Sequence, residues 1–547
     1  MSLKEWWRSS VIYQIYPRSF ADANGDGIGD LAGITSRLPQ LTELGVDAIW
    51  LSPFMTSPQK DAGYDVADYC DVDPLFGTLQ DFDVLEKTAH DLGLRVIVDL
   101  VPNHCSSEHP WFIEALAAGE GSEQRARFMF REGQGAHGEL PPNNWESVFG
   151  GPAWTRTMNP DGTPGQWYLH LFDSSQPDFD WTNPWVRERF REILRFWLDR
   201  GVDGFRVDVA HGLSKAPGLP DFRRDDEYWS TPAEIRPDNP YFGHEGVHEI
   251  YRDWHELLAE YPGERILCAE AFVEPLTKMA QWVRPDEMQH AFNFPFLVTR
   301  WNGEQMRHVI KDSLSAFHAV GAPSTWVLSN HDQIRHATRL AQDPSGKIAD
   351  RITGIGPLTE PKPDNALGLA RGRAASVMML ALPGVAYMYQ GEELGLPEGM
   401  DIPDDKRQDP TFFRTGGASY GRDGCRVPIP WEADAPNFGF GPGGEPWLPQ
   451  PAVYREYSRD LQEGVAGSTL ELYRSALAIR KDRALGEGDL EWIDGTPENV
   501  LGFRNGDVTV FINYSEKPWA LPAGEIILDS GNSADGVLAP AAAVWIV

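Results

Sequence analysis

Residues 201–210, Gly-Val-Asp-Gly-Phe-Arg-Val-Asp-Val-Ala, form a mostly apolar run that is interrupted by a cation and a carboxylate, Arg206 and Asp208. Side chains two positions apart on an extended strand point to the same side. If this strand belongs to a barrel, an Asp near its C-terminal end faces the open mouth, where barrel enzymes hold their active sites. Taken alone, Arg206 and Asp208 are better explained as a structural ion pair at the end of the strand. Only residues elsewhere in the chain can favour an active site.

Working outward from this run, strands alternate with helices along most of the chain. Leu31–Leu44 has apolar residues at helical spacing, ends at Gly45, and lies between two β-type runs, Val11–Tyr16 and Val46–Leu51. Further helices are predicted over Asp81–Leu92, Asn183–Arg200 and Leu470–Arg480. Repeated strand–helix–strand units of this kind favour a parallel sheet joined by right-handed crossovers.

Eight strands of this type can be identified, which is the number in a TIM barrel. They are predicted over Val11–Tyr16, Val46–Leu51, Leu94–Val101, Gly201–Val209, Arg265–Glu270, Ala291–Phe294, Thr325–Asn330 and Val385–Gln390. We therefore predict an α/β protein whose fold is a (β/α)8 barrel.

Two regions do not follow the barrel pattern. Residues 105–172 are rich in Gly, Pro, Asn and Trp and are too long for a connecting loop, so they are predicted to form an inserted domain after strand 3. Residues 481–547 contain short strands separated by turns, which predicts a C-terminal antiparallel β-sandwich. The barrel is then expected to comprise residues 1–104 and 173–480.

Composition narrows the functional classes. Asp plus Glu outnumber Lys plus Arg by 81 to 48, a formal net charge of −33, which disfavours binding to nucleic acid or to an anionic membrane. The four cysteines are widely spaced and read as free thiols of a reducing compartment. Neither a signal peptide nor an apolar stretch of about 18 residues is evident. A cytoplasmic monomer or small homo-oligomer acting on a neutral small molecule is expected.

Polar residues gather where the predicted strands end. They are Asp99, Asn103 and His104 after the third strand, Arg206 and Asp208 after the fourth, Glu270 after the fifth, and Asn330, His331 and Asp332 after the seventh. A barrel mouth would bring these carboxylates to one ligand. Buried carboxylates repel each other and destabilise a fold unless they are paired or used, so a shared active site is the better explanation.

Several carboxylates without a Ser/His or Cys/His nucleophile set indicate acetal chemistry. Cleavage of a glycosidic bond needs one ionised carboxylate at the anomeric carbon and one protonated carboxyl group at the leaving oxygen. Arg206 is expected to keep Asp208 ionised through its opposite charge. Desolvation on the apolar strand 266–269 is expected to keep Glu270 protonated as the proton donor.

Four motifs in chain order resemble those of the α-amylase family of retaining glycoside hydrolases: Asp99-x-x-x-Asn103-His104, Gly204-Phe-Arg-Val-Asp208, Ala269-Glu270 and Ser329-Asn-His-Asp332. Asp61-x-Gly-Tyr64 and Gly421-Arg422-Asp-Gly-Cys-Arg426 are similar to its oligo-1,6-glucosidase and α-glucosidase subgroup. The subgroup motif at Gln176-Pro-Asp-Phe-Asp180 departs from the usual pattern, because Asn is usual where this chain has Asp180. The resemblance extends from about Trp6 to Trp431.

The resemblance implies an exo-acting α-glucosidase that hydrolyses terminal α-1,4 or α-1,6 bonds of short oligosaccharides, with sucrose as a further candidate substrate and transglucosylation as a side activity. Asp208 would be the nucleophile and Glu270 the general acid/base. Asp332 would be the third catalytic residue, which fixes sugar hydroxyl groups and favours the distorted ring. No organic cofactor is implied. The residues implied to bind the substrate are Asp61, Tyr64, His104, Phe149, Phe172, Gln176, Arg206, Val209, His331 and Arg422.

Val209 follows the nucleophile at a position where subgroup members with Val tend to favour α-1,6 bonds. Two alternatives stay open at this point. A sucrose isomerase or trehalose synthase-type transferase would use the same residues, and product analysis would separate it from a hydrolase. A non-enzymatic amylase-like subunit of an amino-acid transporter would need a membrane anchor and would tolerate loss of the carboxylates, which this chain retains.

The loop 22–30 carries alternating oxygen donors. Asp22, Asn24, Asp26 and Asp30, with the carbonyl group of Ile28, match the first part of an EF-hand loop, but the twelfth position is Gly33 and a strand precedes the loop. The subgroup carries a Ca²⁺ or Mg²⁺ ion at a matching loop, so the resemblance implies a structural metal. A loop closed by Asx turns is the alternative.

Overall fold

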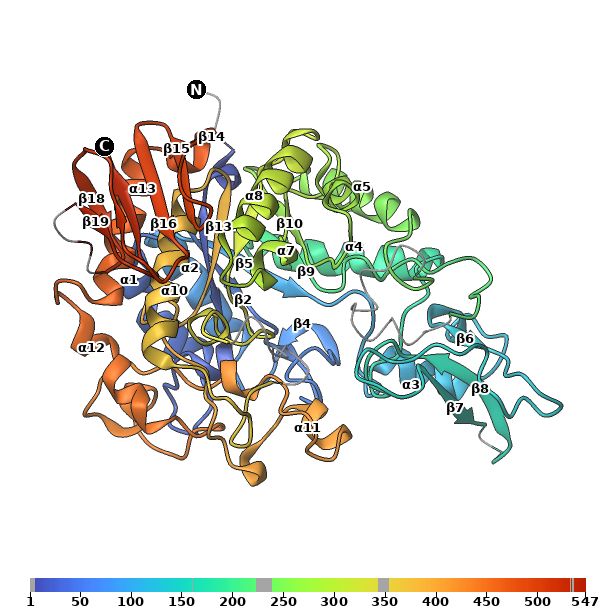
Figure 1. Ribbon diagram of the computed structural model, residues 1–547. Helices are drawn as coiled ribbons and strands as arrows, with labels where there is room; N and C mark the ends of the chain where they lie inside the picture. Colours follow the sequence, from blue (N-terminus) through green and yellow to red (C-terminus); the bar gives the residue numbers. More distant parts are fainter. Residues whose placement is uncertain (1–4, 160, 223–238, 343–353, 532, 534–535) are drawn as a thin grey trace.

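The computed structural model describes residues 5–159, 161–222, 239–342, 354–531, 533 and 536–547 (Figure 1). At its centre lies a parallel eight-stranded sheet in the order β11-β10-β9-β5-β2-β1-β13-β12. The N–H of Asn293, after β11, donates to the carbonyl of Thr325 in β12 at 3.3 Å and joins the two ends of the sheet. The predicted fold class, a TIM barrel followed by a C-terminal antiparallel sheet, is confirmed.

All eight predicted barrel strands are present, although each is shorter than its predicted range. Their bounds are β1 Val11–Ile15, β2 Ala48–Leu51, β5 Arg95–Leu100, β9 Gly204–Val207, β10 Ile266–Ala269, β11 His290–Ala291, β12 Thr325–Val327 and β13 Val385–Tyr389. The sequence pattern overestimates strand length because the polar residues at the strand ends leave the ladder and turn into loops.

The helices start and stop at the expected local signals. In α1, the Asp30 side chain accepts a hydrogen bond from Gly33 N–H at the start, and Gly45 ends the helix with a φ of 97°. The helices are α1 Leu31–Leu44, α2 Leu79–Asp91, α3 Pro110–Ala118, α4 Pro184–Leu198, α5 Gly246–Leu258, α6 Leu276–Met279, α7 Phe294–Val298, α8 Gly303–His318, α9 His336–Arg339, α10 Asn365–Ala381, α11 Pro410–Arg414, α12 Arg459–Gln462 and α13 Thr469–Asp482. None of the described helices has both the length and the apolar composition that a membrane span requires.

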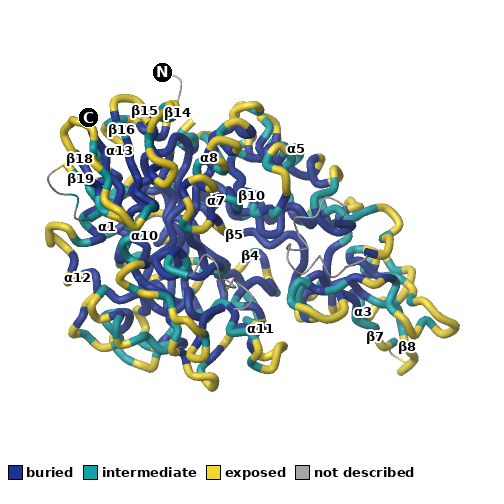
Figure 2. The backbone as a smooth tube through the Cα atoms, viewed as in Figure 1, coloured by how far each residue is buried: buried dark blue, intermediate teal, exposed yellow. Residues whose placement is uncertain are grey.

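The barrel strands are buried along their length (Figure 2), and their alternating side chains belong to two separate buried clusters. In β9, Phe205 and Val207 face outward and join the large cluster formed with the surrounding helices. The interior of the barrel is filled by a second cluster, which includes Trp50, Ile97 and Cys268. Arg206 lies on the inward side of β9, with its guanidinium 5.3 Å from the ring centre of Trp50 in the interior cluster.

Two further regions flank the barrel (Figure 1). Residues 105–172 project to one side and hold the antiparallel sheet β6-β8-β7 (Phe130–Arg131, Pro164–Leu169 and Trp154–Met158). At the C-terminus, the sheet β14-β15-β16-β20-β18 is built from Leu490–Trp492, Val500–Asn505, Val508–Asn513, Ala543–Ile546 and Ile526–Asp529, beside the pair β17 Trp519–Ala520 and β19 Val537–Leu538. A last pair, β3 Met55–Thr56 and β4 Asp68–Val72, follows β2. The division of the chain into three domains stays a prediction.

Candidate active site

One buried guanidinium holds the carboxylates at the floor of the barrel mouth together. Arg206 Nη1 lies 2.9 Å from Asp99 Oδ1 and 2.6 Å from Asp208 Oδ1, and its Nη2 lies 3.2 Å from Glu270 Oε2. The three carboxylates come from the ends of β5, β9 and β10, which are neighbours in the sheet. The Arg206 side chain is only 2% exposed. The sheet register therefore fixes this group, because each strand delivers one side chain to the same point.

The charge balance of this group differs from the sequence-based expectation. Arg206 was expected to keep Asp208 ionised as its own partner, but Arg206 is shared among three carboxylates. Burial raises the pKa of Asp208 well above its usual value; Arg206 lowers it, and Glu270 and Asp99 raise it further. Burial likewise raises the pKa of Asp99 to about 7 against the opposing charge of Arg206. The charge of Arg206 lowers the pKa of both Asp208 and Asp99, but burial outweighs this effect at each of them.

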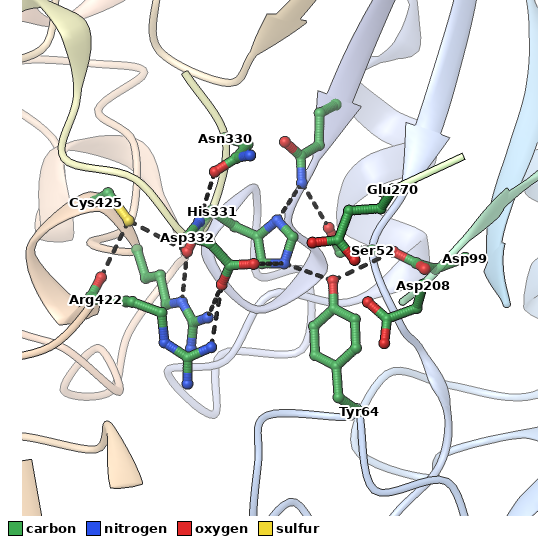
Figure 3. Close-up of polar contacts among 12 residues, drawn as sticks. Ser52, Tyr64, Asp99, Asp208, Glu270, Asn330, His331, Asp332, Arg422 and Cys425 are labelled. Atoms are coloured by element: carbon green, nitrogen blue, oxygen red, sulfur yellow. Dashed lines mark hydrogen bonds and ion pairs between the residues drawn. The ribbon is translucent and has the colours of Figure 1, made fainter. Parts of the chain in front are cut away.

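A histidine packed between two tyrosine rings connects this floor to the next carboxylate. His331 stacks on Tyr64 with ring centres 5.4 Å apart and on Tyr16 at 5.7 Å. The Tyr64 hydroxyl group is hydrogen-bonded to His331 Nε2 and donates to Asp99 Oδ2 at 3.3 Å (Figure 3). Gln14 Nε2 lies 2.6 Å from His331 Nδ1. Burial lowers the pKa of His331 to about 3, so this ring is neutral across the physiological range.

A second arginine, Arg422, is shared by another three carboxylates. Its Nη2 donates to Asp61 Oδ1 at 3.0 Å, its Nη1 to Asp332 Oδ1 at 3.1 Å, and its Nε to Asp409 Oδ2 at 2.7 Å. The side chain of Asp332 also accepts a hydrogen bond from Arg426 Nη2 at 2.8 Å. Figure 3 shows Asp332 directed toward the Arg422 guanidinium, on the opposite side of His331 from Asp208 and Glu270.

The remaining predicted residues complete the same network. Gln176 Nε2 donates to Asp61 Oδ2 at 3.2 Å and lies 3.2 Å from His104 Nε2. Phe172 packs against His104 with ring centres 5.2 Å apart and against Phe149 at 5.6 Å. The Phe149 ring in turn lies 5.6 Å from the Arg422 guanidinium. Every residue that the sequence nominated for catalysis or substrate binding therefore contacts at least one other in the set.

Val209 joins the set through its backbone. Its N–H donates to Glu270 Oε2 at 2.9 Å, and its φ is 46°, in the left-handed region that β-branched residues rarely occupy. The side chain is buried with Phe172 in a cluster at the base of residues 105–172. The residue after Asp208 is thus in direct contact with Glu270, a relation that a regular strand would not provide.

The oxygen donors of the loop 22–30 are used within the loop. Asp22 accepts hydrogen bonds from Gly25 N–H at 2.6 Å and Gly27 N–H at 2.9 Å, and Asp30 accepts from Ala23 N–H at 3.0 Å. No group of three or more His, Cys, Asp or Glu side chains within the described residues is arranged to hold a metal ion. The hard oxygen donors suit Ca²⁺ or Mg²⁺, but the geometry is that of Asx turns. The Ca²⁺ or Mg²⁺ site at Asp22, Asn24, Asp26, Ile28 and Asp30 stays a prediction.

With the site assembled, comparison with known proteins identifies the family. Residues 14–488 match the family model described as α-amylase, catalytic domain. The chain belongs to the α-amylase family. The resemblance inferred from the four motifs is confirmed, and the match covers the barrel strands that carry Asp208, Glu270 and Asp332.

Relatives within the α-amylase family cover nearly the whole chain. A probable α-glucosidase of Rhizobium meliloti (strain 1021) is 38% identical over 94% of this chain and 89% of its own length. An oligo-1,6-glucosidase of Parageobacillus thermoglucosidasius is 34% identical over 94% and 91%. Among solved structures, the α-glucosyl transfer enzyme XgtA superposes with a TM-score of 0.83 at 36% identity, covering 99% of both chains.

Sequence reasoning missed several residues of this α-amylase-family site. Asp409 was not singled out, although it is fully buried and accepts hydrogen bonds from both the N–H and Nε of Arg422 at 2.7 Å. In the sequence Arg426 stands out only as the end of a motif, and Gln14 and Trp50 only as residues of predicted strands. Asp409 lies 13 positions before Arg422 in a region without strand periodicity, so no local pattern points to it.

Proposed function

We propose that this protein is a retaining, exo-acting α-glucosidase that releases terminal glucose from short α-1,4- or α-1,6-linked oligosaccharides. The observation that carries the proposal is that Asp208 and Glu270 contact one guanidinium while Asp332 lies across His331 from them. A close carboxylate pair suits the retaining mechanism, in which no water has to fit between the second carboxylate and the sugar. The α-glucosidase names of the relatives support the same substrate class.

The proposed reaction has two displacement steps. Asp208, as the carboxylate, attacks the anomeric carbon while Glu270 gives its proton to the departing glycosidic oxygen, and a glucosyl ester forms on Asp208. Glu270, now ionised, then takes a proton from a water molecule whose oxygen attacks the same carbon, which frees glucose and restores both carboxyl groups. Arg206 supplies positive charge next to Asp208, at 2.6 Å, throughout the cycle.

The polar groups around Arg422 suit recognition of a terminal sugar. Asp61, Asp332 and His104 present acceptors and donors for sugar hydroxyl groups, while Phe149 and Phe172 supply apolar ring faces. Beyond them, Arg414 in α11 donates to Asp173 Oδ2 at 2.6 Å and to Gly150 O at 3.1 Å, which ties the segment after β13 to residues 105–172. These ties oppose passage of a longer chain past the non-reducing end, so we infer release of one glucose at a time.

Product analysis on maltose, isomaltose, sucrose, trehalose and maltodextrins tests the proposal. Free glucose should appear in proportion to substrate lost, with the α-anomer formed first. We propose a preference for isomaltose over maltose from the position of Val209, a difference that a side chain of this size can shift by only about 1–3 kcal/mol. A clear preference for maltose in direct competition would overturn the linkage proposal and leave the α-glucosidase proposal standing.

Glucosyl transfer is the second candidate function, and the likeness to the α-glucosyl transfer enzyme XgtA favours it. A sugar hydroxyl group can take the place of water in the second step, because both attack the same glucosyl ester. Incubation with sucrose, maltose or trehalose separates the candidates. A rearranged disaccharide formed without an equivalent amount of free glucose would identify an isomerase or a trehalose synthase-type enzyme.

We also propose that the protein acts in the cytoplasm as a monomer or small homo-oligomer without nucleic-acid or membrane partners. Support comes from the formal net charge of −33 and from the four cysteines, each of which is a free thiol. A structural Ca²⁺ or Mg²⁺ ion at the loop 22–30 belongs to the same proposal. Light scattering of the purified protein and metal analysis after gel filtration test these points.

A further inference from the structure

The ladder between β9 and β10 contains an extra residue at the active site. The two strands pair regularly from Gly204 and Ile266 to Val207 and Ala269, and Glu270 N–H donates to Val207 O at 3.0 Å. In a regular parallel ladder, the N–H of Val209 would next donate to Glu270 O. Here Ala210 N–H makes that bond, at 2.8 Å, so that Val209 is bulged out of the ladder.

Neighbouring contacts hold the bulge in a strained conformation. Val209 has a φ of 46°, which costs a β-branched residue about 1–3 kcal/mol unless the surroundings enforce it. Gly212 N–H donates to Val209 O at 2.8 Å, and a Cβ at Gly212 would lie 2.7 Å from Val209 Cγ1. Ala210 O accepts hydrogen bonds from Tyr251 and, at 3.3 Å, from Trp282 Nε1. Main-chain and side-chain contacts therefore fix both sides of Val209.

The bulge turns the N–H of Val209 from the sheet toward a side chain. This N–H lies 2.9 Å from Glu270 Oε2, the oxygen that Arg206 Nη2 approaches at 3.2 Å. Both donors contact Oε2 of Glu270. They therefore fix the orientation of the carboxyl group and leave Oε1 as the oxygen that carries the proton. A main-chain donor in a fixed bulge holds a carboxyl group more rigidly than a flexible side chain would.

We infer that the bulged N–H of Val209 orients the carboxyl group of Glu270 for proton transfer, which makes Val209 a positioning residue that acts through its backbone. This inference rests on the proposed role of Glu270 as general acid/base. It is separate from the role of the Val209 side chain in linkage choice, since the N–H and the side chain leave the backbone in different directions.

Replacing the amide of Val209 by an ester tests the inference, because α-hydroxyisovalerate at position 209 keeps the side chain and removes the N–H. The replacement also weakens the Asp208 carbonyl as an acceptor, an effect that the second ester variant below has at its own preceding carbonyl. For maltose, whose leaving group needs protonation, kcat/KM should fall by about tenfold or more. For p-nitrophenyl α-glucoside, whose leaving group departs without protonation, kcat/KM should fall by less than about threefold. Equal losses on both substrates, or no loss on either, would overturn the inference.

A matched ester at Gly212 removes another N–H of the same turn without touching the Glu270 carboxyl group. It should lower the melting temperature as much as the Val209 ester does, and it should not discriminate between the two substrates. If the Gly212 ester discriminates equally, the effect belongs to the turn as a whole, and Val209 N–H has no positioning role.

Val209→Ala and Val209→Gly test the strained conformation with ordinary variants. Both remove the side chain, but only glycine adopts a positive φ without strain, so Val209→Gly should be the more stable of the two. If Val209→Gly melts below Val209→Ala, the bulge is not strained as described.

Glu270→Gln separates the inference from the proposed function. Retention of maltose hydrolysis by this variant would refute the proposed role of Glu270. Loss of maltose hydrolysis by Glu270→Gln, together with an unaffected Val209 ester, would refute the inference alone.

Discussion

Two arginines organise the active site in different ways. Arg206 and Arg422 each contact three carboxylates, but the partners of Arg206 come from three adjacent barrel strands, whereas those of Arg422 come from loops around residues 61, 332 and 409. The first group, Asp99, Asp208 and Glu270, is called the floor here. The second group, Asp61, Asp332 and Asp409, is called the rim.

The floor and the rim differ in what fixes the positions of their carboxylates. Floor positions are fixed by the hydrogen-bond register of β5, β9 and β10, which tolerates little displacement. Rim positions depend on long loops that contact each other through side chains. We therefore expect floor substitutions to act on the chemical step, and rim substitutions to act on substrate affinity.

The largest effect is expected for Asp208→Asn in the floor. Without a nucleophile the glucosyl ester cannot form, so kcat on maltose should fall at least about a thousandfold, or about 4 kcal/mol. Initial rates measure the loss, and binding of glucose with unchanged affinity shows that the rim is intact. Retention of a tenth of the wild-type rate would remove Asp208 from the nucleophile role.

A smaller effect of a different kind is expected for Asp409→Asn in the rim. Arg422 would lose the negative charge of the partner that accepts from its Nε and its N–H at 2.7 Å. The substrate KM should rise about tenfold, since a hydrogen bond to a charged group contributes about 1.5–3 kcal/mol, while kcat should change less than about threefold. Asp404→Asn, at a side chain 75% exposed in the same segment, is the matched control. A loss confined to kcat would contradict the expectation that rim residues act on substrate affinity.

The pH dependence of glucose binding gives a third test, at the rim residue Asp61. Burial raises the pKa of Asp61 from 3.8 to about 6, against the opposing charges of Arg422 and Arg426, with Asp65 and Asp409 raising it further. Between these values the folded state binds the proton more readily than the unfolded chain, so the contribution of Asp61 to stability increases as pH falls through about 6. The ion pair with Arg422 is lost in the same range, so glucose binding should weaken severalfold.

Inhibition by glucose, measured from pH 5 to pH 8, checks this expectation. In Asp61→Asn, which resembles the protonated form, binding should be weak and should vary less with pH. If Asp61→Asn keeps the wild-type pH dependence, another group of the site is responsible.

The smallest effect is expected from chelation. The loop 22–30 supports the segment that carries Arg422, because Asp22 N–H donates to Phe440 O at 2.8 Å and Trp447 N–H to Gly27 O at 2.9 Å. If the loop holds Ca²⁺ or Mg²⁺, EDTA should lower the melting temperature by a few degrees through loss of binding free energy and raise KM about twofold with kcat unchanged. Asp26→Asn should abolish the difference between EDTA and Ca²⁺. If EDTA leaves the melting temperature of the wild-type protein unchanged, the loop holds no stabilising metal ion and Asx turns alone account for its structure.

The floor could be predicted from sequence more directly than the rim. Asp99, Asp208 and Glu270 follow apolar runs of strand type, and barrel closure brings such positions together whatever the loops do. Asp61 and Arg422 are 361 positions apart with no shared periodicity, so only motif resemblance nominated them, and Asp409 was missed. The raised pKa of Asp208 was also missed, because the sequence does not show that three acids share Arg206.

The bulge at Val209 could not be predicted from the sequence for a similar reason. A pattern of apolar residues predicts that a strand exists, but an added residue in its ladder depends on Glu270 and Trp282, which come from other parts of the chain. The same limit applies to strand ends in general. The run 201–209 was predicted as one strand, whereas β9 includes only Gly204–Val207.

The closure of the barrel has a consequence for how the protein loses activity on warming. β11 has two residues and β12 has three, and within the described residues one main-chain hydrogen bond, from Asn293 to Thr325, spans them. This seam lies between the strand ends that carry Glu270 and Asp332. Fluctuations that part the sheet should begin there, because the remaining strand pairs are longer. Amide protons near the seam should exchange first, and catalysis should fail at temperatures where most of the helical circular dichroism persists.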